Sequence, residues 1–300
     1  MSQTAIRTRN LTKKYGDFHA LKDVTLTVAQ GDIYGLVGRN GAGKTTFFKC
    51  VMGLSRPSAG EIEIGGEAAD LNAARRRMGF MINPSFFPYL GPHENLGYHS
   101  RVKGIRGRGE VERVLKLVGL EGVKKPFKAF SLGMKHRLGI AGALLGAPSI
   151  VALDEPVNGL DPQGIIDMRN VIKDIHAQTG ATFIISSHIL GELDMVATRF
   201  GFIEQGELLK EISHGDLHER TKKSLIVEVG DVPKALSALK ALGIEDVSAS
   251  GNRLTLGSHL DRPNEIARAL VGGGVELYGL YRRETTLEEY FVRLVGGQDG

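Results

Sequence analysis

The sequence predicts an α/β fold built on a parallel sheet, followed by a small α+β domain. The parallel sheet is predicted from three apolar runs and the helical patterns that follow or separate them. A buried apolar run at 32–37 ends in a glycine-rich turn, and a helical pattern follows it. Two more apolar runs, at 149–153 and 182–186, flank a segment with helical periodicity at 162–179. Strand, helix and strand in this order are typical of a parallel sheet covered by helices.

The rest of the pattern divides the chain into two predicted domains. Residues 24–29 alternate between apolar and polar side chains, as a half-buried strand does. The stretch from about 84 to 148 has mainly helical patterns, so we expect a helical subdomain inserted in the α/β domain. After Arg220 the pattern changes to strand, helix, two short strands, helix, strand and a last helix. This order predicts an accessory domain of the ferredoxin-like α+β type at 221–300, after a first domain at 1–220.

Composition and charge are typical of a soluble globular protein and exclude several other classes. Of 300 residues, 42% are hydrophobic and 24% are charged. The single cysteine, Cys50, excludes an internal disulfide and a cysteine-rich zinc site. The amino terminus lacks the apolar run of a secretory signal, and the longest uncharged stretch, Leu138 to Leu153, is too short to span a bilayer. We therefore expect a cytoplasmic protein that reaches a membrane only through a partner.

Residues Gly38 to Thr45 match the phosphate-binding loop pattern G-x-x-x-x-G-K-[S/T]. A predicted strand precedes the loop and a predicted helix follows it, which is the context that this pattern requires. Backbone N–H groups of such a loop converge on a polyphosphate, and the dipole of the following helix adds to the attraction. Lys44 supplies a positive charge, and the Thr45 hydroxyl is expected to ligate Mg²⁺. The expected nucleotide-binding residues here are Gly38, Asn40, Gly41, Gly43, Lys44, Thr45 and Thr46.

A second apolar strand brings two carboxylates to the same predicted site. Asp154 and Glu155 follow the run at 150–153, at the strand end where ligands of α/β sheets bind. We expect Asp154 to bind Mg²⁺, directly or through water, and Glu155 to polarise the attacking water as a general base. With the phosphate loop, these acids predict a P-loop NTPase that uses ATP and Mg²⁺, with Lys44 and Glu155 in catalytic roles.

Further motifs resemble those of the ABC-type ATPases. Phe130–Lys135, which reads Phe-Ser-Leu-Gly-Met-Lys, resembles the signature motif of that family. Gly159–Asp161 resembles its D-loop, and His188 follows a strand as its switch histidine does. The resemblance covers residues 5 to about 215. A narrower resemblance, to the bacitracin- and lantibiotic-type export ATPases, is seen at residues 130–137, 158–161, 186–190 and 286–294.

The resemblance implies an architecture, partners and roles for further residues. It implies a RecA-like parallel sheet with an antiparallel β region and a helical subdomain. It also implies a head-to-tail homodimer with ATP between the subunits, in which Ser131 and Gly133 of one subunit bind the nucleotide of the other. Asp161 is expected to reach across this dimer. His188 is expected to contact the γ-phosphate as a catalytic residue, and Tyr15 to stack on adenine.

Three positions depart from the family pattern. Asn83 stands where the family usually has a glutamine that ligates Mg²⁺. Its amide oxygen is retained, but its side chain is one methylene shorter, so its place in the metal site is an expectation only. Leu132 replaces the first signature glycine. His136 stands where relatives carry glutamine, which adds a titratable group near the signature helix.

An aromatic segment follows Asn83. Phe86, Phe87 and Tyr89 lie among prolines and form either the core of a loop or an exposed surface. In the family this region forms the groove that receives a cytoplasmic helix of the membrane subunit. Because exposed aromatic clusters mark interfaces, we favour docking of an integral-membrane permease here.

The expected function is therefore the ATP-hydrolysing subunit of an ABC exporter, held at the inner face of the cell membrane by its permease. The expected cargo is an antimicrobial peptide, an antibiotic or another amphipathic compound. The alternative is a soluble ABC ATPase that acts on nucleic acid or ribosomes. Such proteins carry long coiled-coil or zinc insertions, or two ATPase units in one chain, and this sequence has neither pattern. The net charge of +4 requires no nucleic-acid partner, and we expect none.

A regulator that binds nucleotide without catalysis is a further alternative. Such a protein is expected to lack the general base or the switch histidine. Both Glu155 and His188 are present, which favours an active ATPase.

Overall fold

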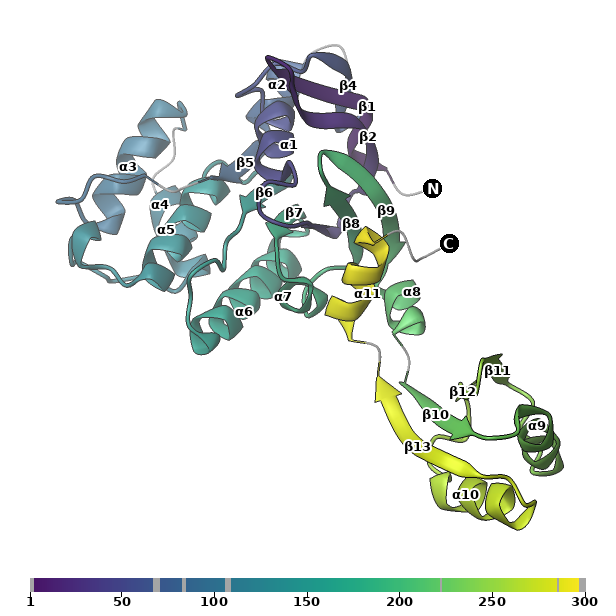
Figure 1. The fold of residues 1–300 in the computed structure, drawn as a ribbon. Coiled ribbons are helices and arrows are strands. Elements are labelled where there is room, and N and C mark those ends of the chain that lie inside the picture. Colours follow the sequence, from purple (N-terminus) through teal and green to yellow (C-terminus); the bar gives the residue numbers. More distant parts are fainter. Residues whose placement is uncertain are drawn as a thin grey trace. The chain divides into compact units, whose positions relative to one another are not determined.

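The computed structural model describes residues 3–66, 71–82, 85–105, 109–221, 223–284 and 286–296. Contacts within the chain divide it into two compact units, and the boundary lies between His214 and Gly215. Buried apolar side chains form a separate cluster in each unit. Figure 1 shows the elements of both units with their labels.

The first unit is built on a six-stranded sheet. Its strands are β3 (Ile33–Val37), β5 (Met78–Met81), β6 (Ile150–Asp154), β7 (Thr182–Ser187), β8 (Arg199–Glu204) and β9 (Glu207–Ser213). Their order in the sheet is β5-β6-β7-β3-β8-β9. All neighbours are parallel except β8 and β9, which are antiparallel. Every residue of β3 and β7 is buried, as expected for central strands covered on both faces.

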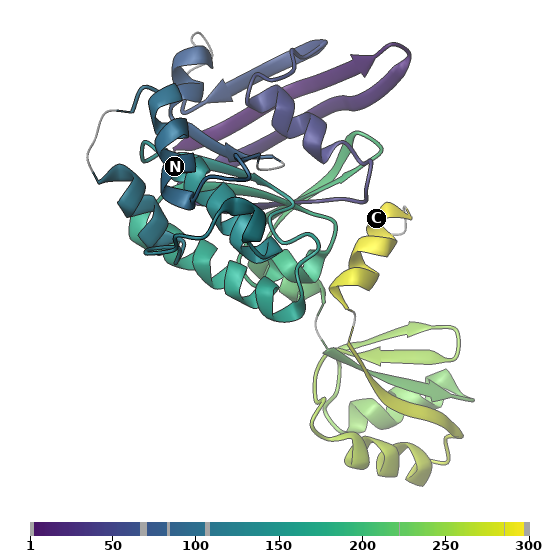
Figure 2. The same cartoon turned by 90° about the vertical axis from the view of Figure 1, so that its left-hand side faces the viewer.

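A smaller antiparallel sheet completes the β structure of this unit. Its strands are β1 (Thr4–Tyr15), β2 (Phe18–Ala29) and β4 (Ala59–Ile64), in the order β2-β1-β4. Figure 2 shows these strands beside the helices of the first unit. Leu26 of this sheet packs in one cluster with Tyr34 of β3 and with Phe48. The predicted combination of a parallel sheet with an antiparallel β region is thus confirmed.

The helices of the first unit surround the parallel sheet. They are α1 (Lys44–Val51), α2 (Leu71–Arg76), α3 (Pro92–Val102), α4 (Glu110–Leu117), α5 (Leu132–Leu144), α6 (Pro162–Thr179) and α7 (Leu190–Asp194), with a 3₁₀ turn at Phe127–Ala129. Helices α3, α4 and α5 pack against one another and form a group of their own in Figure 1. In the part of residues 85–148 that the structure describes, there is no strand. This is the stretch where the sequence predicts helices.

The second unit has its own four-stranded antiparallel sheet. Its elements are α8 (His214–Arg220), which begins at the unit boundary, and then β10 (Lys223–Val229), α9 (Val232–Ala241), β11 (Val247–Ser250), β12 (Arg253–Leu256), α10 (Pro263–Gly272), β13 (Leu277–Glu284) and α11 (Leu287–Val295). The sheet order is β11-β12-β10-β13. Before β13, the Val275 N–H donates to Leu270 O near the end of α10, at 3.0 Å.

Candidate nucleotide-binding site

The loop at residues 38–43 connects the end of β3 to the start of α1. Gly43 precedes the helix with φ of 111°, a backbone conformation that favours glycine. A Cβ at this position would also lie 2.6 Å from the carbonyl oxygen of Ala20. A cavity of about 360 Å³ lies over this turn. Its lining residues come from the start of β2, the loop, the start of α1 and the end of β6: Phe18, Ala20, Asn40, Gly41, Gly43, Lys44, Thr45, Thr46 and Glu155.

Lys44 is held beside this cavity by three oxygen atoms. Its side chain is only 6% exposed. The Nζ atom donates to Gly38 O at 2.6 Å and to Arg39 O at 3.1 Å, and it lies 3.2 Å from Glu155 Oε1. The loop therefore carries a positive charge in a fixed position, as a polyphosphate site requires.

Asp154 occupies the end of β6, next to the loop. Its Oδ2 accepts from Thr45 Oγ1 at 2.7 Å, and its Oδ1 accepts from Ser186 Oγ at 2.6 Å. The parallel pairing of β6 with β7 places Ser186 directly opposite Asp154. Carboxylate and hydroxyl oxygens are the ligands that Mg²⁺ prefers, so Asp154 and Thr45 fit a magnesium site.

Glu155 follows Asp154 and has an uncommon backbone conformation. Its φ is 50°, in the left-handed region that non-glycine residues rarely adopt. Its Oε2 lies 2.8 Å from His188 Nδ1, and its other oxygen faces Lys44. Three residues that are far apart in the sequence thus meet beside the cavity, because parallel strands bring their carboxyl ends to one edge of the sheet.

Three further predicted residues lie elsewhere. Ser131 caps α5 by accepting from the Met134 N–H at 3.3 Å, and Asp161 caps α6 by accepting from the Gly164 N–H at 3.1 Å. Neither these residues nor Gly133 are among those that line the cavity over the loop. A single chain therefore does not bring the signature segment to its own phosphate loop.

Two other residues, Tyr15 and Asn83, are predicted to contact the nucleotide and its metal. The Tyr15 ring is stacked under the Lys13 ammonium, 4.9 Å away, and its hydroxyl is 3.5 Å from Ser55 Oγ. The aromatic residue that lines the cavity is Phe18, three positions further on. Asn83 lies outside the described residues.

His136 connects the signature helix to the loop after Glu155. Its Nδ1 lies 2.7 Å from Pro156 O, and because a carbonyl only accepts, the ring nitrogen donates. Burial lowers the pKa of this imidazole below its usual value, although the bond to Pro156 opposes the shift.

The aromatic segment is partly packed and partly exposed. Phe86 packs against His99 and Phe127, with ring centres 5.1 and 5.3 Å apart. Phe87 and Tyr89 are 46% and 77% exposed.

Asn95 of α3 holds this loop in place. It is fully buried, and its Oδ1 accepts from the Phe87 N–H at 2.8 Å. Its Nδ2 donates to three carbonyl oxygens, those of Phe87, Leu90 and Gly91, at 3.0–3.1 Å.

Sequence reasoning did not single out Asn95 or Ser186. Each is a polar residue in an otherwise buried position. The only sequence signal for Ser186 is a hydroxyl at the end of the apolar run of β7, and the one for Asn95 is an amide inside a predicted helix. The signal for Ser186 does not name Asp154, because that partner lies on another strand. The signal for Asn95 does not show that its side chain turns back to the backbone of the loop just before α3.

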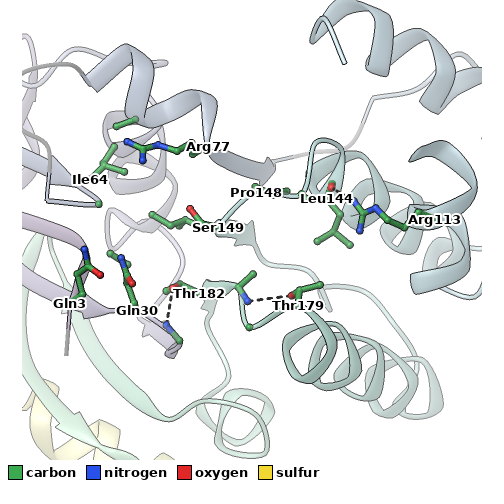
Figure 3. Close-up of a pocket in the computed structure, with 18 residues that line it drawn as sticks. Gln3, Gln30, Ile64, Arg77, Arg113, Leu144, Pro148, Ser149, Thr179 and Thr182 are labelled. Atoms are coloured by element: carbon green, nitrogen blue, oxygen red, sulfur yellow. Dashed lines mark hydrogen bonds between the residues drawn. The ribbon is translucent and has the colours of Figure 1, made fainter. Parts of the chain in front are cut away.

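Figure 3 shows a second cavity, of about 400 Å³, at the opposite end of the strands. It lies where Ser149 precedes β6 and Thr182 begins β7, and the side chains of Gln30 and Arg77 also border it. None of the predicted site residues lines it. Because ligands of α/β sheets bind beyond the carboxyl ends of the strands, we place the nucleotide site at the phosphate loop.

Known proteins resemble this chain in sequence and in fold. The family model described as ABC transporter matches residues 21–158. The chain is 40% identical to the bacitracin transport ATP-binding protein BcrA of Bacillus licheniformis, over 98% of each chain. It is 37% identical to the lantibiotic transport ATP-binding protein SrtF of Streptococcus pyogenes, over 69% of this chain and 90% of the relative.

A solved structure resembles it with a TM-score of 0.62 and 25% identity, covering 70% of this chain and 98% of the other. That structure is a dimeric, post-hydrolysis state of an ATP-binding cassette bound to ADP and phosphate.

The fold and the site define an α/β nucleotide-binding protein with a phosphate-binding loop. The chain belongs to the ATP-binding proteins of ABC transporters, ATPases whose hydrolysis of ATP is coupled to transport. None of the helices in the described part of the chain has the length and apolar character needed to cross a membrane.

Proposed function

We propose that this protein hydrolyses ATP to power the export of an antimicrobial peptide, an antibiotic or another amphipathic compound through a separate membrane permease. The convergence of Lys44, Asp154, Glu155 and His188 at one edge of the sheet carries the catalytic part of this proposal. The printed functions of two relatives, bacitracin transport and lantibiotic transport, support the class of cargo.

In the proposed reaction a water molecule attacks the γ-phosphorus, and ADP leaves. Glu155 takes the proton from that water, while His188 and Lys44 face the transferring phosphoryl group. Mg²⁺, held by Thr45 and Asp154 with Asn83 as a further ligand, supplies charge neutralisation to the phosphates when it is bound. The other contacts to the nucleotide are assigned to Gly38, Asn40, Gly41, Gly43, Thr46 and Tyr15.

The second half of the nucleotide site is proposed to come from another copy of the chain. Ser131 and Gly133 lie at the start of α5, where backbone N–H groups and the helix dipole attract an anion. They do not line the cavity over the phosphate loop of their own chain. In a head-to-tail homodimer, Ser131 and Gly133 of one subunit would face the phosphate loop of the other. Asp161 of each subunit would reach across the interface.

The permease is proposed to dock on the exposed aromatics Phe87 and Tyr89. They project from a loop that four hydrogen bonds to the buried Asn95 hold in one shape. Docking there would hold the protein at the inner face of the membrane. It would also report nucleotide state, because the loop directly follows Asn83.

We propose that residues 221–300, which follow helix α8 in the second unit, form an accessory domain of the ferredoxin-like type. The βαββαβ order and the sheet order β11-β12-β10-β13 support this type.

Substitution of Glu155 by Gln tests the catalytic assignment. We expect the rate of ATP hydrolysis to fall at least about 100-fold, because the amide cannot accept the proton of water, while ATP binding persists. Size-exclusion chromatography with ATP should show an enriched dimer. Lys44→Ala is the contrasting variant, since it removes the cation and should weaken ATP binding itself. A Glu155→Gln protein that hydrolyses ATP at the wild-type rate would refute the assignment.

A further inference from the structure

Ser186 lies at the carboxyl end of β7, between the two carboxylate residues of the site. It is fully buried, with the apolar Ile185 before it in the strand and the buried Ser187 after it. Its Oγ donates to Asp154 Oδ1 at 2.6 Å and accepts from the Glu155 N–H at 2.9 Å. A hydroxyl has one proton to donate and lone pairs to accept with, so this single atom serves both partners.

Each of these two contacts controls something that the reaction needs. The bond to Asp154 is short and charge-assisted, and it fixes the rotation of a carboxylate whose other oxygen accepts from Thr45. The bond to the Glu155 N–H holds a residue whose φ of 50° is unfavourable for a side chain of this size. A non-glycine residue keeps such a conformation only when its surroundings impose it.

We propose that Ser186 is a positioning residue for ATP hydrolysis, whose hydroxyl simultaneously orients the Asp154 carboxylate toward the metal and locks the Glu155 backbone toward the attacking water. This inference rests on the proposed roles of Asp154 and Glu155. An apolar residue in the same place would fill the volume but leave a half-buried carboxylate oxygen and a half-buried N–H without that partner. Metal affinity and turnover would then fall together, with the phosphate loop unchanged.

The test compares Ser186→Ala with Ser186→Thr, which keeps the hydroxyl, and with a matched control. Thr182→Val is that control, because Thr182 is buried in the same strand and its Oγ1 accepts from the Gly31 N–H at 3.0 Å, at the far end of the sheet (Figure 3). All variants are made in the full chain. Three quantities are measured. They are the affinity for Mn²⁺ in the presence of a non-hydrolysable ATP analogue, followed by the EPR signal of the free ion, the kcat with saturating Mg²⁺, and the affinity for ATP in EDTA.

We expect Ser186→Ala to lose about 10-fold or more in Mn²⁺ affinity and in kcat, the range typical for residues that orient metal ligands. Affinity for ATP in EDTA should stay at the wild-type value, because the phosphate loop is untouched. Ser186→Thr should recover most of both losses, and Thr182→Val should match the wild type in both. Wild-type Mn²⁺ affinity in Ser186→Ala, or equal losses in Thr182→Val, would overturn the inference.

Two further measurements keep the result interpretable. If Ser186→Ala does not fold, Ser186→Cys retains the size of the side chain but has a weaker donor, and it should show the same losses. Asp154→Asn is measured alongside. If Asp154→Asn weakens Mn²⁺ binding and Ser186→Ala does not, only the role of Ser186 is refuted. If neither weakens it, the proposed metal site is refuted as well.

Discussion

At the scale of single residues, Glu155 has an unfavourable backbone conformation at the centre of the site. A left-handed φ costs a non-glycine residue roughly 1–2 kcal/mol. Contacts to Lys44, His188 and Ser186 offset this cost. The result is a carboxylate that lines the cavity before any reaction, in a position suited to the proposed general base.

His136 should make stability depend on pH. Because burial lowers the pKa of His136 below 6.5, the unfolded chain takes up this proton at a higher pH than the folded chain does. The free energy of unfolding should therefore fall as the pH drops below about 6.5, and this fall should be smaller in His136→Gln, which keeps a donor for Pro156 O. Denaturant unfolding at neutral and mildly acidic pH measures both slopes.

His99 is a second half-buried histidine that should contribute to the pH dependence of stability. Burial also lowers the pKa of His99, so His136→Gln should retain part of the pH dependence and the double variant His136→Gln/His99→Gln should retain less. Identical slopes for wild type and His136→Gln would show that the imidazole of His136 does not contribute.

At the scale of elements, residues 86–91 before α3 are held by packing and by hydrogen bonds. Phe86 is anchored by packing, and Asn95 satisfies the backbone around Phe87. Among the described aromatic contacts, Phe87 packs against one ring, that of Tyr98, with the ring centres 5.0 Å apart. A rigid loop with exposed aromatic side chains binds a partner at a low cost in conformational entropy.

Replacement of Phe87 and Tyr89 together by Ser should weaken capture of the detergent-solubilised permease and leave the ATPase rate of the isolated chain unchanged. Aromatic residues that act as hot spots of an interface cost about 2 kcal/mol or more of binding free energy when they are truncated. A pull-down with the ATPase rate measured in parallel tests this. Leu54→Ser is the matched control, since Leu54 is also an exposed apolar residue of the first unit. Undiminished capture would place the docking surface elsewhere, and loss of the fold would show that the two aromatics are structural.

At the scale of the whole molecule, the chain consists of two units with separate cores. The buried side chains of one cluster all come from between Ala5 and Ile203, and those of the other all come from between Leu225 and Val275. Domains with separate cores usually fold independently.

A chain that ends at Arg220 should therefore fold and bind ATP with an affinity within about twofold of the full chain. Circular dichroism and equilibrium nucleotide binding are the measurements. Residues 221–300, expressed alone, should give a cooperative unfolding transition. An insoluble or unfolded 1–220 fragment would mean that the two parts depend on each other and that the proposed boundary is wrong.

The sequence by itself determined the phosphate loop, the strand that ends in Asp154 and the order of the elements after residue 221. In the first unit it determined the elements around the site but not the strands β1, β4, β8 and β9. The predicted features are local: glycine spacing, apolar runs and helical periodicity all act within one segment. Helix α6, at Pro162–Thr179, begins and ends at the residues that periodicity predicts, because Asp161 caps its start and Gly180 its end.

Only the tertiary structure decided which side chains meet. The register of β6 with β7 places Ser186 beside Asp154, and no pattern within either segment encodes that pairing. The same holds for the contact of Glu155 with His188, which come from the ends of two different strands. Polar contacts between distant segments depend on sheet register and on burial, which the sequence specifies only through the packing of the whole unit.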